Sequence, residues 1–98
     1  MHVIVWEFEA KPGSETEFER AYGPRGAWVE FFARAPGYSG TELLRDRDTP
    51  GRYVTIDRWR SRENFEAFRD ANRAEYAAID RRCEDLTRHE RLLGRFEA

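Results

Sequence analysis

Three Pro-Gly pairs divide this chain of 98 residues into segments whose apolar residues recur with different periods. Both residue types are unfavourable inside regular structure, so Pro12-Gly13, Pro36-Gly37 and Pro50-Gly51 each mark the end of an element. The segment before the first pair, residues 2–9, has a period of two, which predicts a strand. One face of that strand carries His2, Ile4, Trp6 and Phe8, and the other carries Val3, Val5, Glu7 and Glu9.

The segment between the first two pairs has a helical period. Ser14 followed by Glu17 is a capping-box signature and predicts that a helix starts here. The run Gly-Pro-Arg-Gly at 23–26 predicts a kink or break, because proline removes a helical hydrogen bond. Helical spacing resumes at Trp28 and continues to Ala35.

The third pair predicts a β-hairpin. Residues 38–46 and 52–60 have the character of strands, and Pro-Gly suits the two central positions of a type II turn. Alternation on the second strand puts Val54, Ile56 and Arg58 on one face. It puts Tyr53, Thr55, Asp57 and Trp59 on the other.

The last part of the chain predicts a second helix and a closing strand. Ser61 suits the N-cap of a helix. Apolar positions then recur at intervals of three and four from Phe65 to Cys83, which predicts one continuous stripe. A break near Ala71, with Asn72 capping a second segment, is the alternative. Residues 86–97 are expected to form the closing strand.

The order strand, helix, strand, strand, helix, strand predicts an α+β fold of the ferredoxin-like type, with both helices on one face of an antiparallel sheet. We expect a single domain over residues 1–98. Val3 and Val5 place apolar surface on the face that the helices leave open. A second copy of the chain would cover that face, so the sequence predicts a homodimer.

Composition supports a folded chain whose core consists of rings. Leu, Ile and Val together number 12, fewer than the 14 aromatic residues, and the net charge is only −2. Disordered chains are poor in aromatic residues. The sixteen Arg are interleaved with Asp and Glu, which argues against a nucleic-acid-binding surface.

Other classes are excluded by missing signals. No apolar run is long enough to span a membrane, and the first ten residues lack the pattern of a secretory signal, so a cytoplasmic location is expected. Cys83 is the single cysteine, so we expect neither an internal disulfide nor a metal site. His2 is expected to be exposed, and His89 to lie on a solvated or interface strand.

The motifs that punctuate these elements resemble those of the antibiotic biosynthesis monooxygenase (ABM) domain family over nearly the whole chain. They are Phe18 with Tyr22, Ala35-Pro36-Gly37-Tyr38, the run ELLRD at 42–46, Asp57-Arg58-Trp59 with Ser61, and Phe65 with Phe68. The resemblance implies a dimeric α+β barrel with a pocket between the helices and the sheet of each subunit. Studied members include cofactor-free oxygenases that convert aromatic hydroquinones into quinones, and haem-degrading enzymes.

The resemblance separates the two branches by residue. The haem-degrading branch uses an Asn, a Trp and a His, and the matching positions here are Trp6, Phe68, and Ile79 or Asp80. The quinone-forming branch uses an Asn, a Trp and a Tyr on or near the second helix. Asn72 and Tyr76 match two of these, and Phe68 stands at the Trp position. This branch implies that no cofactor is needed.

Such chemistry requires the protein to bind a flat aromatic molecule, take a proton from it and stabilise the anion. The catalytic candidates are Asn72 and Tyr76, and the substrate-binding candidates are Trp28, Arg58, Trp59 and Phe68. Each has a simpler explanation as well: a helix cap for Asn72, an ion pair for Arg58, and core packing for the aromatic residues.

The sequence therefore predicts a protein that binds a small planar aromatic, with cofactor-independent monooxygenase activity as the leading function. A non-catalytic binding or assembly module on the same fold is the alternative, and an isomerase or decarboxylase is a third. An open cavity near Trp28, Phe68, Asn72 and Tyr76 is the feature that separates these hypotheses best.

Overall fold

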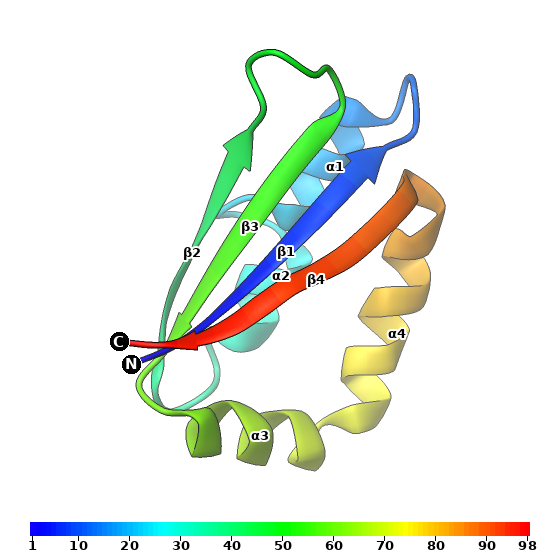
Figure 1. The fold of residues 1–98 in the computed structure, drawn as a ribbon. Coiled ribbons are helices and arrows are strands. Elements are labelled where there is room, and N and C mark those ends of the chain that lie inside the picture. The colour runs from blue at the N-terminus through cyan, green and yellow to red at the C-terminus, as the bar shows by residue number, and fades with distance from the viewer.

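A computed structural model describes residues 1–98 and contains one antiparallel sheet of four strands in the order β2-β3-β1-β4 (Figure 1). The strands are β1 (His2–Ala10), β2 (Tyr38–Arg45), β3 (Arg52–Trp59) and β4 (Thr87–Glu97). Placing the last strand beside the first is what a ferredoxin-like chain requires. The predicted α+β fold is confirmed.

In Figure 1 the first two helices lie behind the strands, the third runs below the sheet and the fourth stands beside β4. The helices are α1 (Glu15–Tyr22), α2 (Ala27–Phe32), α3 (Arg62–Ala71) and α4 (Arg73–Cys83), followed by a short 3₁₀ turn, η1 (Glu84–Leu86). None of them is long and apolar enough to cross a membrane.

The β2–β3 connection is the predicted type II turn. The Arg52 N–H donates to the Thr49 carbonyl over 3.2 Å, which closes a four-residue turn around Pro50 and Gly51. Gly51 has a φ of +85°, a conformation that the third residue of this turn type needs and that side chains disfavour. The Pro-Gly pair thus fixes the hairpin locally.

The first helical region starts and breaks where the sequence predicts, but its cap is different. The Ser14 side chain makes no capping bond, so the predicted capping box is wrong. Glu15 accepts a hydrogen bond from the Gly13 N–H at 2.9 Å instead, because the turn brings that amide within reach of the first helical carboxylate. The break at 23–26 is confirmed and separates α1 from α2.

The second helical stripe is two helices that meet at Asn72. The backbone there leaves the helical region at φ −130° and ψ 34°, so the prediction of one continuous helix is wrong; the alternative is confirmed in its break but not in its cap of the second segment. The Asn72 amide donates to the Phe68 carbonyl at 2.9 Å and therefore caps the end of α3, not the start of α4. Ser61 accepts from the Asn64 N–H at 3.1 Å, which confirms the predicted cap of α3.

Aromatic rings fill the space between the helices and the sheet. Phe18 and Tyr22 stack with centroids 4.4 Å apart, and Trp59 is completely buried. Ring pairs add roughly 0.5–1.5 kcal/mol beyond the area they bury. This confirms a core of rings in a chain with few aliphatic residues.

His2 is buried, contrary to the expectation of exposure. It is only 1% exposed, and its Nδ1 lies 3.0 Å from the Glu97 carboxylate. The end of β4 pairs with the start of β1, and Phe65 packs 6.4 Å away. Burial of His2 therefore depends on a strand 95 residues away in the chain.

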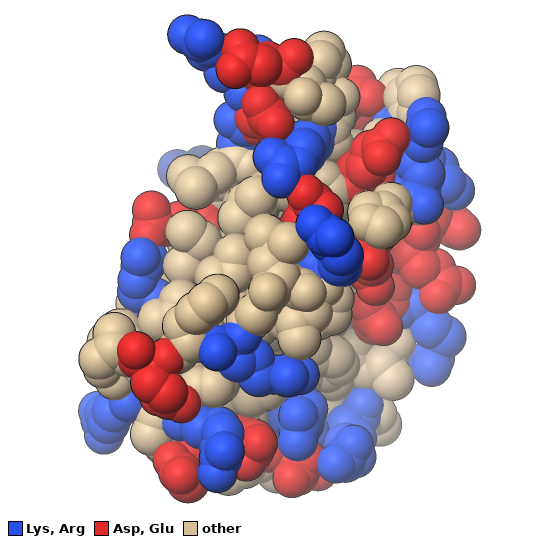
Figure 2. All heavy atoms as spheres, in the orientation of Figure 1, with Lys and Arg blue, Asp and Glu red and all other residues tan.

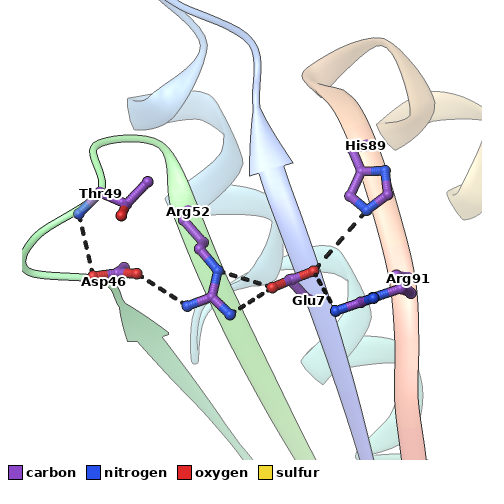
Figure 3. Close-up of polar contacts among 6 residues, drawn as sticks. All are labelled: Glu7, Asp46, Thr49, Arg52, His89 and Arg91. Carbon is purple, nitrogen blue, oxygen red and sulfur yellow. Dashed lines mark hydrogen bonds and ion pairs between the residues drawn. The ribbon is translucent and has the colours of Figure 1, made fainter.

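The outer face of the sheet has an uncharged centre bordered by charged side chains (Figure 2). Leu44 and Phe96 are about half exposed, at 47% and 52%. At one end of this face, Glu7 of β1 accepts from Arg52 of β3 at 2.8 and 2.5 Å (Figure 3). Arg91 of β4 lies 3.3 Å from the same carboxylate, so this ion-pair network ties three strands together.

Candidate functional site

A cavity of about 240 Å³ lies between the helices and the covered face of the sheet. Six of the residues that line it are aromatic, and the other five are polar or acidic. The aromatic residues are Trp6, Phe8, Tyr22, Trp28, Phe32 and Tyr76, and the others are Thr41, Thr55, Asp57, Asp80 and Glu90. Every strand and three of the helices contribute to this lining.

The aromatic walls pack against one another as well as facing the cavity. Trp28 lies edge-on to Tyr76, with centroids 5.1 Å apart and planes at 66°. Phe8 and Tyr22 are 4.7 Å apart. Because the chain breaks at 23–26, α2 starts at Ala27 and places Trp28 in the cavity lining. Mutual packing fixes the wall orientations, and flat walls suit a flat ligand.

Asp57 faces the cavity at the end of a short hydrogen-bonded relay. Thr41 donates to Asp57 Oδ1 at 2.6 Å, and the Tyr38 hydroxyl lies 2.5 Å from Thr41 Oγ1. Because the Thr41 proton is directed to Asp57, Tyr38 donates to Thr41. The second carboxylate oxygen of Asp57 has no hydrogen-bond partner in the protein, which leaves it free for a ligand.

The surroundings of Asp57 adjust its proton affinity. Burial raises the pKa of Asp57 to about 6, and the hydrogen bond from Thr41 opposes that rise. No basic side chain forms an ion pair with it. A carboxyl group with a pKa this close to neutrality, in a cavity, is suited to general acid–base work.

Tyr76 supplies a hydroxyl group to the same cavity. It has no hydrogen-bond partner in the protein, and burial raises its pKa above the ordinary value. The phenol therefore stays protonated at neutral pH. It can donate a hydrogen bond to a ligand oxygen without losing its proton.

Most of the chain matches the model of a known protein family. The model described as antibiotic biosynthesis monooxygenase matches residues 1–79. The chain belongs to the antibiotic biosynthesis monooxygenase family. The predicted resemblance is confirmed.

Individual ABM-family proteins are similar in fold over the whole chain. A variant of SnoaB, a cofactor-independent oxygenase from Streptomyces nogalater, superposes with a TM-score of 0.81 at 26% identity, covering 99% of this chain and 91% of its own. The haem degrader MhuD from Mycobacterium tuberculosis gives 0.71 at 28% identity, covering 100% and 95%.

A curated relative is similar over part of its length. Deoxynogalonate monooxygenase from Streptomyces nogalater is 40% identical over 53 residues, which are 54% of this chain and 42% of that enzyme. The match thus spans less than half of the relative.

The cavity brings together two of the predicted site residues, Trp28 and Tyr76. Phe68 packs behind the lining, 4.8 Å from Phe31, and Trp59 lies within the core. The Asn72 amide is engaged by the Phe68 carbonyl and does not line the cavity.

Arg58 lies on the outer face of the sheet, as its alternation with Val54 and Ile56 predicts. Its guanidinium forms an ion pair with Glu42 of the neighbouring strand. This was the simpler of the two explanations for Arg58, and it places the side chain on the face opposite the cavity.

Asp57, Thr41 and Thr55 were not predicted from the sequence as site residues. A signal was available for the first, because Asp57 alternates with Tyr53 and Trp59 on the covered face of β3. An unpaired carboxylate on such a face lowers the stability of the fold, and its presence there therefore indicates a functional role. The partner Thr41 comes from another strand and has no local signal.

The lining does not fit a haem held by histidine, the ligand of the haem-degrading branch. His2 is packed against Phe65 and Glu97, and His89 lies 53% exposed on the outer face near Glu7. Neither histidine lines the cavity. No group of three or more His, Cys, Asp or Glu side chains is arranged to hold a metal ion.

Proposed function

We propose that this ABM-family protein is a cofactor-independent monooxygenase that oxidises a planar phenol, hydroquinone or anthrone with molecular oxygen. One observation carries the proposal: Asp57 presents an unpaired carboxylate oxygen to a cavity with aromatic walls, and its pKa is raised to about 6. The cavity volume of about 240 Å³ favours a compact ligand, since pockets for drug-sized ligands measure roughly 300–1,000 Å³.

Asp57 is the proposed base. At pH 7 a carboxyl group with a pKa of about 6 is mostly ionised, yet it is a far stronger base than an ordinary aspartate. Its free oxygen accepts the substrate proton while Thr41 holds the other oxygen in place at 2.6 Å. The Tyr38 hydroxyl extends the relay and orients Thr41.

Tyr76 is the proposed stabiliser of the substrate anion. Its hydroxyl donates a hydrogen bond to the oxygen on which negative charge develops, because it stays protonated at neutral pH. The deprotonated substrate then passes an electron to oxygen. With an anthrone, the CH₂ group becomes C=O, one oxygen atom enters the product, and the other leaves as water with the two hydrogens. The substrate supplies every electron.

Oxygen uptake with a panel of hydroquinones and anthrones tests this proposal. We expect uptake by the metal-free wild-type protein, near-complete loss in Asp57→Asn, and a drop of about tenfold or more in Tyr76→Phe. Asp85→Asn, which removes an exposed carboxylate on η1, is the matched control and retains wild-type uptake.

Three outcomes would contradict the proposal. Folded protein that consumes no oxygen with any substrate but still binds aromatics would support the binding or assembly module. Product formed without oxygen would support an isomerase or decarboxylase. Full activity in Asp57→Asn would remove the proposed base.

We also propose that the active form is a homodimer with the outer sheet faces together. The centre of that face is uncharged, and Leu44 and Phe96 on this face are exposed. Such a patch favours a partner, and self-complementary pairing is the commonest arrangement. Light scattering at micromolar concentration should give twice the chain mass. Phe96→Asp should give the monomer, and Arg81→Glu on α4 should not; a monomeric wild-type protein would overturn the proposal.

A further inference from the structure

The carboxylates that line the cavity have no positive partners. Asp57, Asp80 and Glu90 form no ion pair, whereas Glu7 on the opposite face has two arginines within 3.3 Å. Asp80 and Glu90 are exposed and stand at the opening, while Asp57 lies partly buried within. Burial and the charges of Asp80 and Glu84 raise the pKa of Glu90, so the acidic groups at this opening repel one another.

A second observation points to a ligand in the same space. Thr55 is 4% exposed, lines the cavity and has no hydrogen bond for its hydroxyl. That hydroxyl opens onto the cavity and can bond to a ligand there, and Asp57 offers its free oxygen beside it on β3.

Positive charge lies on the other side of Asp57. A smaller cavity of about 70 Å³ shares Trp6, Phe32, Asp57 and Tyr76 with the main one, and Arg69 and Arg95 line it. No arginine, lysine or histidine lines the main cavity itself. The combined space therefore has acidic groups on one side of Asp57 and two arginines on the other.

We propose that the substrate is an aromatic molecule that carries a protonated amine, with the amine held at the opening by Asp80 and Glu90 and the reacting oxygen directed to Asp57 and Thr55. This inference rests on the proposed function in taking the cavity as the substrate site. Uncompensated carboxylates around a partly enclosed space attract cations and reject anions. Aromatic carboxylates should accordingly bind more weakly than amines of the same shape.

Calorimetric binding of three probes with one ring system tests the inference. The probes are 2-naphthylmethylamine, 2-naphthalenemethanol and 2-naphthoate, which differ in the charge of a single substituent. We expect the amine to bind about tenfold or more tightly than the alcohol, and the carboxylate to bind most weakly. The preference should shrink in about 0.5 M salt, since charge and not shape produces it.

In the double variant Asp80→Asn, Glu90→Gln, the affinities for the amine and the alcohol should lie within about twofold of each other. Glu17→Gln/Glu63→Gln, which makes the same change in net charge at exposed positions of α1 and α3, should keep the full preference. Equal binding of the three probes by the wild type, tighter binding of the carboxylate, or a preference unaffected by the double variant would overturn the inference.

The two proposals fail separately. Oxygen uptake without an amine preference would overturn this inference and leave the proposed oxidation standing. An amine preference in a protein that consumes no oxygen would overturn the oxidation and leave the recognition standing.

Discussion

Two carboxylates of the same sheet, Glu7 and Asp57, occupy opposite faces and have opposite properties. The hydrogen bond from Arg52 lowers the pKa of Glu7, and Arg91 and His89 add to the effect (Figure 3). Burial without a basic partner raises the pKa of Asp57 to about 6. The first group is an ion-paired link between strands, and the second is the base that we propose. The surroundings, not the residue type, decide which role a carboxylate has.

Replacing Asp57 should reduce oxygen uptake more than any other change to these two carboxylates. Asp57→Asn keeps an oxygen for the Thr41 hydrogen bond but removes the base, so we expect oxygen uptake to fall by about 10²–10⁴-fold. Initial rates with an anthrone at pH 7 measure the effect. A fall of less than about tenfold would show that another group takes the proton.

The same variant should gain stability, and the sign follows from the pKa. Because the folded-state pKa of about 6 exceeds the ordinary aspartate value of 3.8, wild-type stability declines as pH rises between these values. Above pH 6 the free energy of unfolding of Asp57→Asn should therefore exceed that of the wild type by up to about 2–3 kcal/mol, measured by urea denaturation. The difference should vanish below pH 4. A loss of stability at pH 7 would contradict the assigned environment.

Thr41→Val should sharpen the comparison by raising the pKa of Asp57. The Thr41 hydroxyl lowers that pKa, so its removal should move the activity profile to higher pH. One lost hydrogen bond corresponds to about one pH unit, or about fivefold lower activity at pH 6 with little change at pH 8.5. A uniform loss at every pH would indicate damage to the cavity instead.

Glu7→Gln should affect stability and leave the chemistry unchanged. The network that joins β3, β1 and β4 weakens, so the melting temperature should fall by a few degrees at pH 7. The lowered pKa of Glu7 means that this stabilisation is lost as pH falls below about 4.5, where both proteins should converge. Unchanged kcat with an anthrone completes the contrast with Asp57.

Asn72→Ala should have the smallest effect. Its amide caps α3 through the Phe68 carbonyl and lies outside the cavity lining, so we expect oxygen uptake within about twofold of wild type and a loss of about 0.5–1 kcal/mol of stability. A large drop in activity in a folded variant would return Asn72 to the catalytic role that the family resemblance implies.

The features that could be predicted from the sequence depend on neighbouring residues. The Pro50-Gly51 turn, the Ser61 cap and the break at 23–26 each have a local steric or hydrogen-bonding cause. Asn72 was ambiguous because an amide can occupy a helical stripe or end a helix, and the sequence does not decide between them.

The site depends on contacts between distant segments. The surroundings of Asp57 arise because the β2–β3 register places Thr41 opposite it and no basic residue forms an ion pair with it. His2 is buried by the pairing of the first strand with the last. Alternation places Asp57 on the covered face of β3 but does not show which side chains surround its carboxylate, so the fold was predictable and the proposed base was not.

The placement of the three tryptophans gives the protein an optical reporter. Trp6 and Trp28 line the cavity, whereas Trp59 is enclosed in the core. Quinones accept electrons and quench indole emission on contact, so turnover to a quinone would darken two of the three emitters. The unlabelled protein can thus signal occupancy and product release in real time, against a constant background from Trp59.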